Sequence, residues 1–146
     1  ESDEYMVARL LAYVMEFTPG IEFSRGVSTP DEPTIAVRDL TGAMKTWIDI
    51  GTPDADRLHK ASKLAERVVV YTHKDPAQFV KQLDGRKIHN AETLELYALD
   101  RALIAALVTR LERRVSFSVS ITDRELYLSI GADQLTGHVV RLNRDE

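Results

Sequence analysis

The chain has 146 residues, of which 44% are hydrophobic and 29% charged, a composition typical of one soluble globular domain rather than of a disordered or fibrous chain. The absence of cysteine excludes disulfides, a thiolate nucleophile and cysteine-based zinc or iron–sulfur sites, and it suits a reducing cytoplasm. The formal net charge of −4 gives no overall attraction to nucleic acid or to an anionic membrane, so only a local basic patch could bind either.

No segment resembles a membrane anchor or a secretory signal. The longest apolar stretch, residues 5–13, is interrupted by Arg9 and is far shorter than the roughly 20 residues that span a bilayer. The chain begins with acidic residues rather than with a basic patch and an apolar run. We therefore expect a cytoplasmic protein with no membrane partner.

The first third predicts a buried helix followed by a β-meander. Ser2 is the expected N-cap of a helix that runs through Phe17, is apolar on almost every face and is stopped by Pro19-Gly20. Breaks are dense from residue 21 to residue 51, and short extended pieces fit between them. The expected strands are residues 21–25, 34–38 and 45–50.

The middle of the chain predicts an α/β arrangement. A helix is expected to start at Thr52-Pro53-Asp54, with Thr52 as its N-cap and an apolar stripe at helical spacing. Residues 68–71 are β-branched without polar alternation, which is typical of an interior parallel strand. Further elements are expected along the chain: a helix at 75–83, a strand at 94–99 and a helix at 101–112.

The last quarter predicts antiparallel β structure. The expected strands are residues 115–121, 125–130 and 139–142, joined by a turn at Thr122-Asp123-Arg124 and by a looser connection over 131–137. No linker or internal repeat divides the chain. We expect a single domain over residues 1–146 with a mixed central sheet flanked by helices, an α/β fold, and this additional antiparallel segment.

Asp49 is the most informative polar residue. It lies between Ile48 and Ile50 on a predicted strand, where an unpaired buried carboxylate is costly. The carboxylate therefore needs a cation, which could be a metal ion, Lys60 or Arg57 from the next helix, or Arg38 from the preceding strand. A structural ion pair and a functional site are both open interpretations.

Two other groups have the residue types for phosphate or metal chemistry. Asp31 and Glu32 lie between two prolines that restrict the local backbone, and paired carboxylates suit Mg²⁺. The alternative is a solvated turn.

Arg57 and Lys60 are three residues apart on one helical face, and Lys63 and Arg67 extend that basic face. Most such faces are only solvated.

The four histidines have no metal-ligand spacing, and common nucleotide and hydrolase motifs are absent from the sequence.

Six segments stand in a characteristic order: RLLAY at 9–13, FSRG at 23–26, DEP at 31–33, DLTG at 39–42, WIDIG at 47–51, and the stretch from Pro53 through Lys60 to VVVY at 68–71. This order resembles the YaeQ family of small bacterial proteins. The likeness continues more weakly through ELYLS at 125–129.

The resemblance implies a variant of the PD-(D/E)XK fold of restriction endonucleases, in which acids from adjacent strands and from the first helix face one site. It places Asp31, with Glu32 beside it, at the first acid position and Asp49 where the family usually has glutamate. Glu4 or Glu1 would be the acid of the leading helix. The implied ligand is Mg²⁺, with Mn²⁺ as a substitute, bound by these four positions: Asp31, Asp49, Glu32 and Glu4.

The chain departs from that pattern in two ways. The nuclease lysine two residues after the second acid is replaced by Gly51, so Lys60 would have to supply its charge. Family members also begin with two strands ahead of the first helix, and we expect the intact protein to contain them. Without those strands, the β segment at 115–142 would have an exposed edge that favours dimerisation or strand exchange.

Two functions follow as hypotheses. The first is a metal-dependent phosphodiesterase acting on nucleic acid, with Asp31, Asp49 and Lys60 as catalytic residues and with Arg57, Lys60 and Arg25 binding phosphate. The second is a nuclease-like scaffold without turnover, a binding module in which the same residues form a buried ion network.

Overall fold

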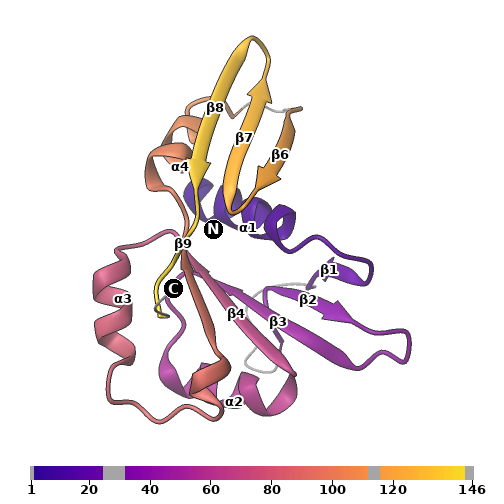
Figure 1. Cartoon of the computed structure of the whole chain (residues 1–146), viewed down its shortest axis with the longest axis vertical. Coiled ribbons are helices and arrows are strands. Elements are labelled where there is room, and N and C mark those ends of the chain that lie inside the picture. The colour runs from indigo at the N-terminus through magenta and orange to yellow at the C-terminus, as the bar shows by residue number, and fades with distance from the viewer. Residues whose placement is uncertain (1, 25–31, 112–115, 144–146) are drawn as a thin grey trace.

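The computed structural model describes residues 2–24, 32–111 and 116–143, and these form two β-sheets and four α-helices (Figure 1). The larger sheet has the strand order β1-β2-β3-β4-β5-β9. Its strands are β1 (Ile21–Phe23), β2 (Ile35–Arg38), β3 (Met44–Ile50), β4 (Arg67–Thr72), β5 (Glu95–Ala98) and β9 (Val140–Arg141). The mixed central sheet expected from the sequence is confirmed.

Strand direction changes across this sheet. The meander β1-β2-β3 is antiparallel, β3, β4 and β5 are parallel to one another, and β9 returns antiparallel to β5. The β-branched run in β4 therefore has parallel neighbours on both sides, as its sequence predicts, and residues 68–72 are buried. The carboxyl ends of three parallel strands thus meet at one edge.

Helices cover both faces of the larger sheet. On one face pack α1 (Asp3–Met15) and α4 (Arg101–Val108), and on the other pack α2 (Ala55–Leu64) and α3 (Pro76–Leu83). A short 3₁₀ helix, η1 (Ala91–Thr93), precedes β5. Side chains alternate along β3, so Trp47 joins the α2 and α3 core while Ile48 joins the α1 and α4 core. Asp49 shares the face of Trp47.

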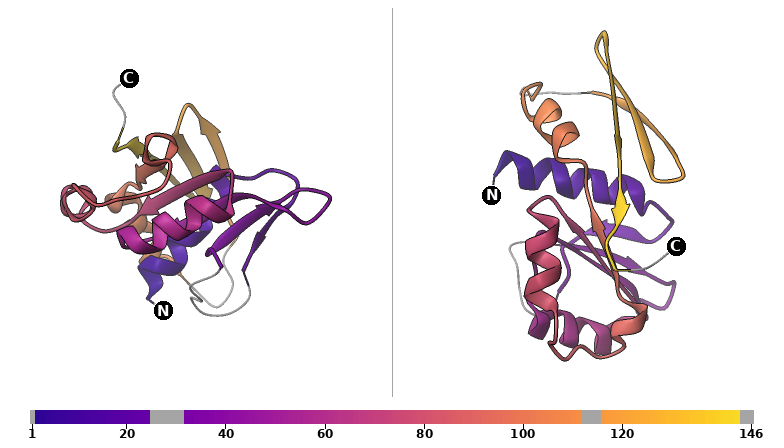
Figure 2. Two further views of the ribbon diagram at one scale, coloured as in Figure 1. Left: turned by 90° about the horizontal axis from the view of Figure 1, so that it is seen from below. Right: turned by 60° about the vertical axis from the view of Figure 1, so that its left-hand side comes forward.

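The second sheet is antiparallel and has the order β6-β7-β8, with bounds Ser118–Thr122, Glu125–Ile130 and Asp133–His138. Leu126 and Leu128 of β7 are buried in the same core as α1 and α4. Figure 2 shows α1 running between this sheet and the larger one. The second sheet therefore forms an outer layer over the first helix.

The expected connection over residues 131–137 is wrong, because β8 occupies Asp133–His138 and pairs with β7 along its length. Only Leu135 and Gly137 of β8 are shielded from solvent, so the segment lacks an apolar pattern and is fixed by pairing. The expected strand at 139–142 is shorter and joins the larger sheet as β9 beside β5.

Several local expectations are corrected at element ends. Ser2 caps α1, and its hydroxyl accepts the Tyr5 N–H as predicted, but Met6 and Leu10 are exposed, so the helix is buried on one face only. The N-cap of α2 is Asp54 rather than Thr52, and its carboxylate accepts the Arg57 N–H at 2.9 Å.

No helix among the described residues is long and apolar enough to cross a membrane.

Gly137 sets how closely β8 approaches α4. A Cβ added there would lie 2.6 Å from Leu103 Cδ2 and 2.9 Å from Leu103 Cβ, too close for a real contact. We expect Gly137→Ala to lower the free energy of unfolding by about 1–2 kcal/mol, because the α4 side chains cannot retreat without strain. Urea unfolding measures the change, and Thr136→Ala, at an exposed position on the same strand, should change little. Equal effects of the two substitutions would contradict this packing.

Candidate functional site

The candidate site lies at the carboxyl ends of the parallel strands β3 and β4, the edge at which open α/β sheets usually bind ligands. Asp49 approaches it from β3 and Arg57 from α2, on one face of the sheet. His73 follows β4, and its ring meets Tyr5 of α1 on the other face. The edge is therefore lined from two strands and two helices.

Arg57 is the cation that compensates Asp49. Its Nε donates to Asp49 Oδ2 at 2.7 Å and its Nη2 donates to Asp49 Oδ1 at 3.1 Å, a two-point pairing. The Asp49 side chain is 3% exposed and that of Arg57 22% exposed. The Thr34 N–H also reaches Asp49 Oδ1, at 3.4 Å. Both carboxylate oxygens are thus already hydrogen-bonded within the protein.

Arg57 is itself held by several groups. Nη2 also donates to the Glu32 carbonyl at 2.7 Å, and the guanidinium carbon lies 5.2 Å from the centre of the Trp47 ring. Burial lowers the pKa of Arg57, but the hydrogen bond and charge of Asp49 outweigh it, so the pKa of Arg57 is raised overall. Asp49 and Arg57 together connect β3 and α2 to the backbone of Glu32 and Thr34.

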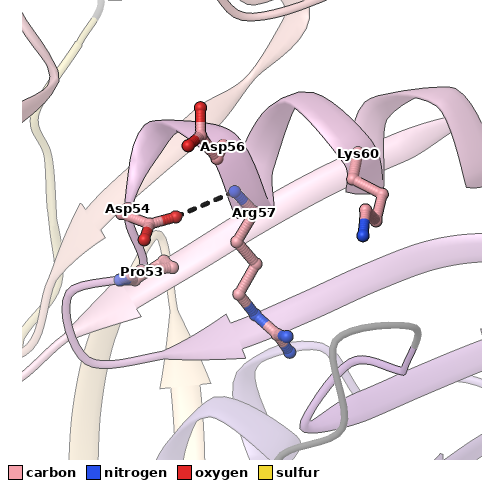
Figure 3. Close-up of a pocket in the computed structure, with 5 residues that line it drawn as sticks. All are labelled: Pro53, Asp54, Asp56, Arg57 and Lys60. Atoms are coloured by element: carbon pink, nitrogen blue, oxygen red, sulfur yellow. Dashed lines mark hydrogen bonds between the residues drawn. The ribbon is translucent and has the colours of Figure 1, made fainter.

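Lys60 belongs to a neighbouring pocket of about 470 Å³, lined by Pro53, Asp54, Asp56, Arg57 and Lys60. Figure 3 shows Arg57 and Lys60 leaving α2 on the same side, whereas Asp56 points away from them. This agrees with the expectation that both cationic groups reach one place. The structure records no contact between Lys60 and Asp49, so Lys60 is not the partner of that carboxylate.

The expected metal ligands are only partly brought together. Asp31 and Glu1 lie outside the described residues, as does Arg25, which was expected to bind phosphate. The Glu32 side chain is exposed and its backbone carbonyl, not its carboxylate, meets Arg57. Glu4 is exposed in the first turn of α1. Within residues 2–24, 32–111 and 116–143, no group of three or more histidine, aspartate or glutamate side chains could hold a metal ion.

Arg67 does not extend the basic face of α2, contrary to expectation, because it lies on β4. It forms ion pairs of 2.6 Å with both Glu16 and Glu95, and Glu16 also accepts the Tyr71 hydroxyl at 2.5 Å. The Glu95 hydrogen bond contributes most to raising the pKa of Arg67, while burial, followed by the charge of Glu16, raises that of Tyr71. This network joins α1 to β4 and β5 and has a structural role.

His73 is the residue that the sequence interpretation missed. It is 8% exposed, and its Nδ1 is buried with no hydrogen-bond partner among the described residues. Burial is the largest of the effects that lower its pKa. The available signal was its position directly after the buried run of β4, where a parallel strand delivers side chains to the ligand-binding edge. Because His73 has no metal-ligand spacing to another histidine, the motif search did not single it out.

The fold and the site define a class: an α+β protein with a mixed six-stranded sheet and an ion-paired carboxylate at the carboxyl ends of its parallel strands. A family model described as YaeQ protein matches residues 1–139, so the chain belongs to the YaeQ family. The resemblance read from the sequence is confirmed at this level.

Known relatives agree with that assignment. The uncharacterised YaeQ protein of Salmonella typhi is 29% identical over 136 residues, covering 92% of this chain and 75% of the relative. That of Escherichia coli K12 is 29% identical over 130 residues, covering 88% and 72%.

Two solved structures share the fold. The crystal structure of YaeQ from Xanthomonas axonopodis pv. citri has a TM-score of 0.80 and 32% identity, covering 97% of this chain and 80% of that one. The crystal structure of YaeQ from Pseudomonas syringae has a TM-score of 0.87 at 24% identity, covering 99% and 80%. The similarity thus extends over nearly the whole chain.

Proposed function

We propose that this chain is a cytoplasmic binding module without turnover, built on a nuclease-like scaffold, whose α2 cations bind the phosphate backbone of nucleic acid. The observation that carries the proposal is the two-point pairing of Arg57 with Asp49. In this arrangement the acid that a nuclease would use for its metal stabilises the protein instead.

The described residues do not fit a metal site. A divalent ion at Asp49 would have to displace a guanidinium that holds both oxygens of a carboxylate that is 3% exposed. Breaking a buried, hydrogen-bonded ion pair of this kind costs on the order of 3–5 kcal/mol. In this proposal Asp49 therefore has a structural role and binds no Mg²⁺.

A restriction-endonuclease-like scaffold remains part of the proposal. Its support is the succession of a leading helix, an antiparallel β1-β2-β3 meander and a parallel β4 reached through α2. Asp49 lies near the end of β3, at the position implied by the resemblance. A fold can keep such a framework while its site changes chemistry.

The cationic side of α2 supports phosphate binding. Lys60 is exposed and projects on the same side as Arg57, whereas Asp54 accepts the Arg57 backbone N–H as the N-cap. Lys63 follows one turn later and is also exposed. Such a row can attract a phosphate backbone locally despite the net charge of −4.

Fluorescence anisotropy with labelled single- and double-stranded oligonucleotides tests this proposal. We expect Lys60→Ala to weaken binding several-fold and to lower the slope of log affinity against log salt by about one, because one phosphate contact is lost. Lys45→Ala is the matched control, since Lys45 is exposed near the amino end of β3, away from the site. Absence of oligonucleotide binding, or equal effects of the two variants, would contradict the proposal.

A Mg²⁺-dependent phosphodiesterase is the second candidate. One observation favours it: Arg57 donates to the Glu32 carbonyl and Asp49 accepts the Thr34 N–H, so the segment that carries Glu32, one of the expected metal ligands, is held beside Asp49. This candidate requires Arg57 to release Asp49. Cleavage of an oligonucleotide with Mg²⁺ or Mn²⁺, abolished by a folded Asp49→Asn variant, would establish it in place of the binding module.

A further inference from the structure

A hydrogen bond to a histidine ring joins α2 to the loop at residues 84–90, between α3 and η1. The backbone N–H of His89 donates to His59 Nδ1 at 2.8 Å, and the two rings meet edge-on with 6.3 Å between their centres. Among the described residues, this is the hydrogen bond that joins the loop to α2. The loop is otherwise exposed except for Ile88, which packs against the α2 and α3 core. Ile88 and this hydrogen bond therefore hold the loop in place.

The hydrogen bond forms only when the His59 ring is neutral. Nδ1 can accept an N–H only while it carries no proton, so the neutral ring has its proton on Nε2. Protonation would place an N–H at Nδ1 opposite the N–H of His89, with no acceptor between the two donors. The contact therefore favours the neutral form of His59 over the charged form.

The surroundings of His59 also disfavour its charged form. Burial is the largest effect that lowers the pKa of His59, and the charges of Lys63 and Lys87 lower it further. His89 adds to this lowering, and Asp56 is the group that raises the pKa. Lys63 lies four residues after His59, on the same side of α2. Because the pKa lies below its ordinary value of 6.5, the contact is complete above that pH and is lost as the pH falls through the lowered pKa.

We propose that this hydrogen bond is a pH-sensitive latch: protonation of His59 at acidic pH breaks it, releases the loop at 84–90 from α2 and adds a cation to the phosphate-binding side of α2. The last effect rests on the proposed function, since His59 adjoins Lys60 in sequence and lies one turn before Lys63. A further positive charge there strengthens the local attraction of a phosphate backbone. By linkage, bound nucleic acid favours the protonated ring in return.

Hydrogen exchange of the His89 amide and the ¹H–¹⁵N signals of the His59 ring test the latch directly. At pH 7.5 we expect a ring with its proton on Nε2 and a protected amide. Between pH 7.5 and pH 5 the protection factor should fall about tenfold, as the loss of one hydrogen bond allows. A neutral ring with its proton on Nδ1, or a protection factor that does not fall over this range, would overturn the latch.

Three variants make the result specific to His59 Nδ1. His59→Asn offers an amide oxygen near the position of Nδ1, an acceptor that does not titrate, so protection should stay high at both pH values. His59→Phe keeps a ring without an acceptor, so protection should be low at both. His89→Phe is the matched control, because it keeps the donating backbone N–H and should keep the pH response. A pH response in His59→Asn equal to that of the wild type would overturn the latch.

Binding of a labelled 12-nucleotide oligothymidylate, whose bases do not titrate between pH 7.5 and pH 5, tests the effect on α2. At constant ionic strength we expect the affinity of the wild type to rise about threefold on acidification, as one added surface ion contact allows, and that of His59→Asn to rise less. Equal rises would overturn the effect on α2 and leave the latch in place. If no oligonucleotide binds at either pH, the proposed function fails, and the His89 amide alone decides the latch.

Discussion

Replacing Asp49 with alanine is expected to lower the free energy of unfolding by about 3 kcal/mol, because it breaks a buried ion pair. The change removes an anion that is 3% exposed and leaves Arg57 without its two-point partner. It also frees the Thr34 N–H that Asp49 accepts. Urea unfolding followed by circular dichroism measures the loss.

A double-mutant cycle shows whether the pair is responsible. Arg57→Leu alone should also destabilise the protein, because it leaves Asp49 as a buried unpaired carboxylate. The double variant Asp49→Ala/Arg57→Leu should be milder than the sum of the single variants, since the interaction between the two side chains is then lost once and not counted twice. Strict additivity, or an Asp49→Ala variant as stable as the wild type, would contradict the structural assignment.

The second large effect is expected at Glu16, the acid that joins α1 to β4. Glu16→Ala should lower the free energy of unfolding by about 2 kcal/mol, because Tyr71 and Arg67 both lose a hydrogen-bond partner. Arg67 is 38% exposed and keeps Glu95, so solvent screening and the remaining ion pair limit the loss. The same unfolding measurement applies.

Two matched variants make the Glu16 result specific. Tyr71→Phe removes the donor hydroxyl only and should cost about 1 kcal/mol. Glu22→Ala removes the exposed 3.6 Å ion pair with Arg38 and should change stability by less than about 0.5 kcal/mol. Equal losses at Glu16 and Glu22 would mean that the network adds nothing beyond an ordinary surface ion pair.

Much of the larger sheet could be predicted because its signals are local. The β-branched run in β4 and the capped apolar stripe of α2 each depend on neighbouring residues. By contrast, β8 could not be predicted, since its polar sequence is fixed by pairing with β7. The placement of β9 beside β5 likewise depends on residues more than forty positions away in sequence.

The sequence predicts that Asp49 needs a cation beside it, but it does not predict which cation that is. A carboxylate flanked by isoleucines on a strand had to find a cation, and Arg57 was one of the alternatives. The identity of the cation depends on where the first turns of α2 place each side chain relative to β3. Local sequence patterns do not specify that placement. His73 was missed for a related reason: its significance comes from Tyr5 and Gly51, which approach it from other elements.

We propose that Asp49 is a structural partner of Arg57 and not a metal ligand. Calorimetric titration of Mn²⁺ into the folded wild type and a folded Asp49→Asn variant tests it most directly. We expect no saturable binding to either protein, because Arg57 donates hydrogen bonds to both carboxylate oxygens of Asp49. Saturable binding to the wild type that disappears in Asp49→Asn would contradict it and would favour the phosphodiesterase.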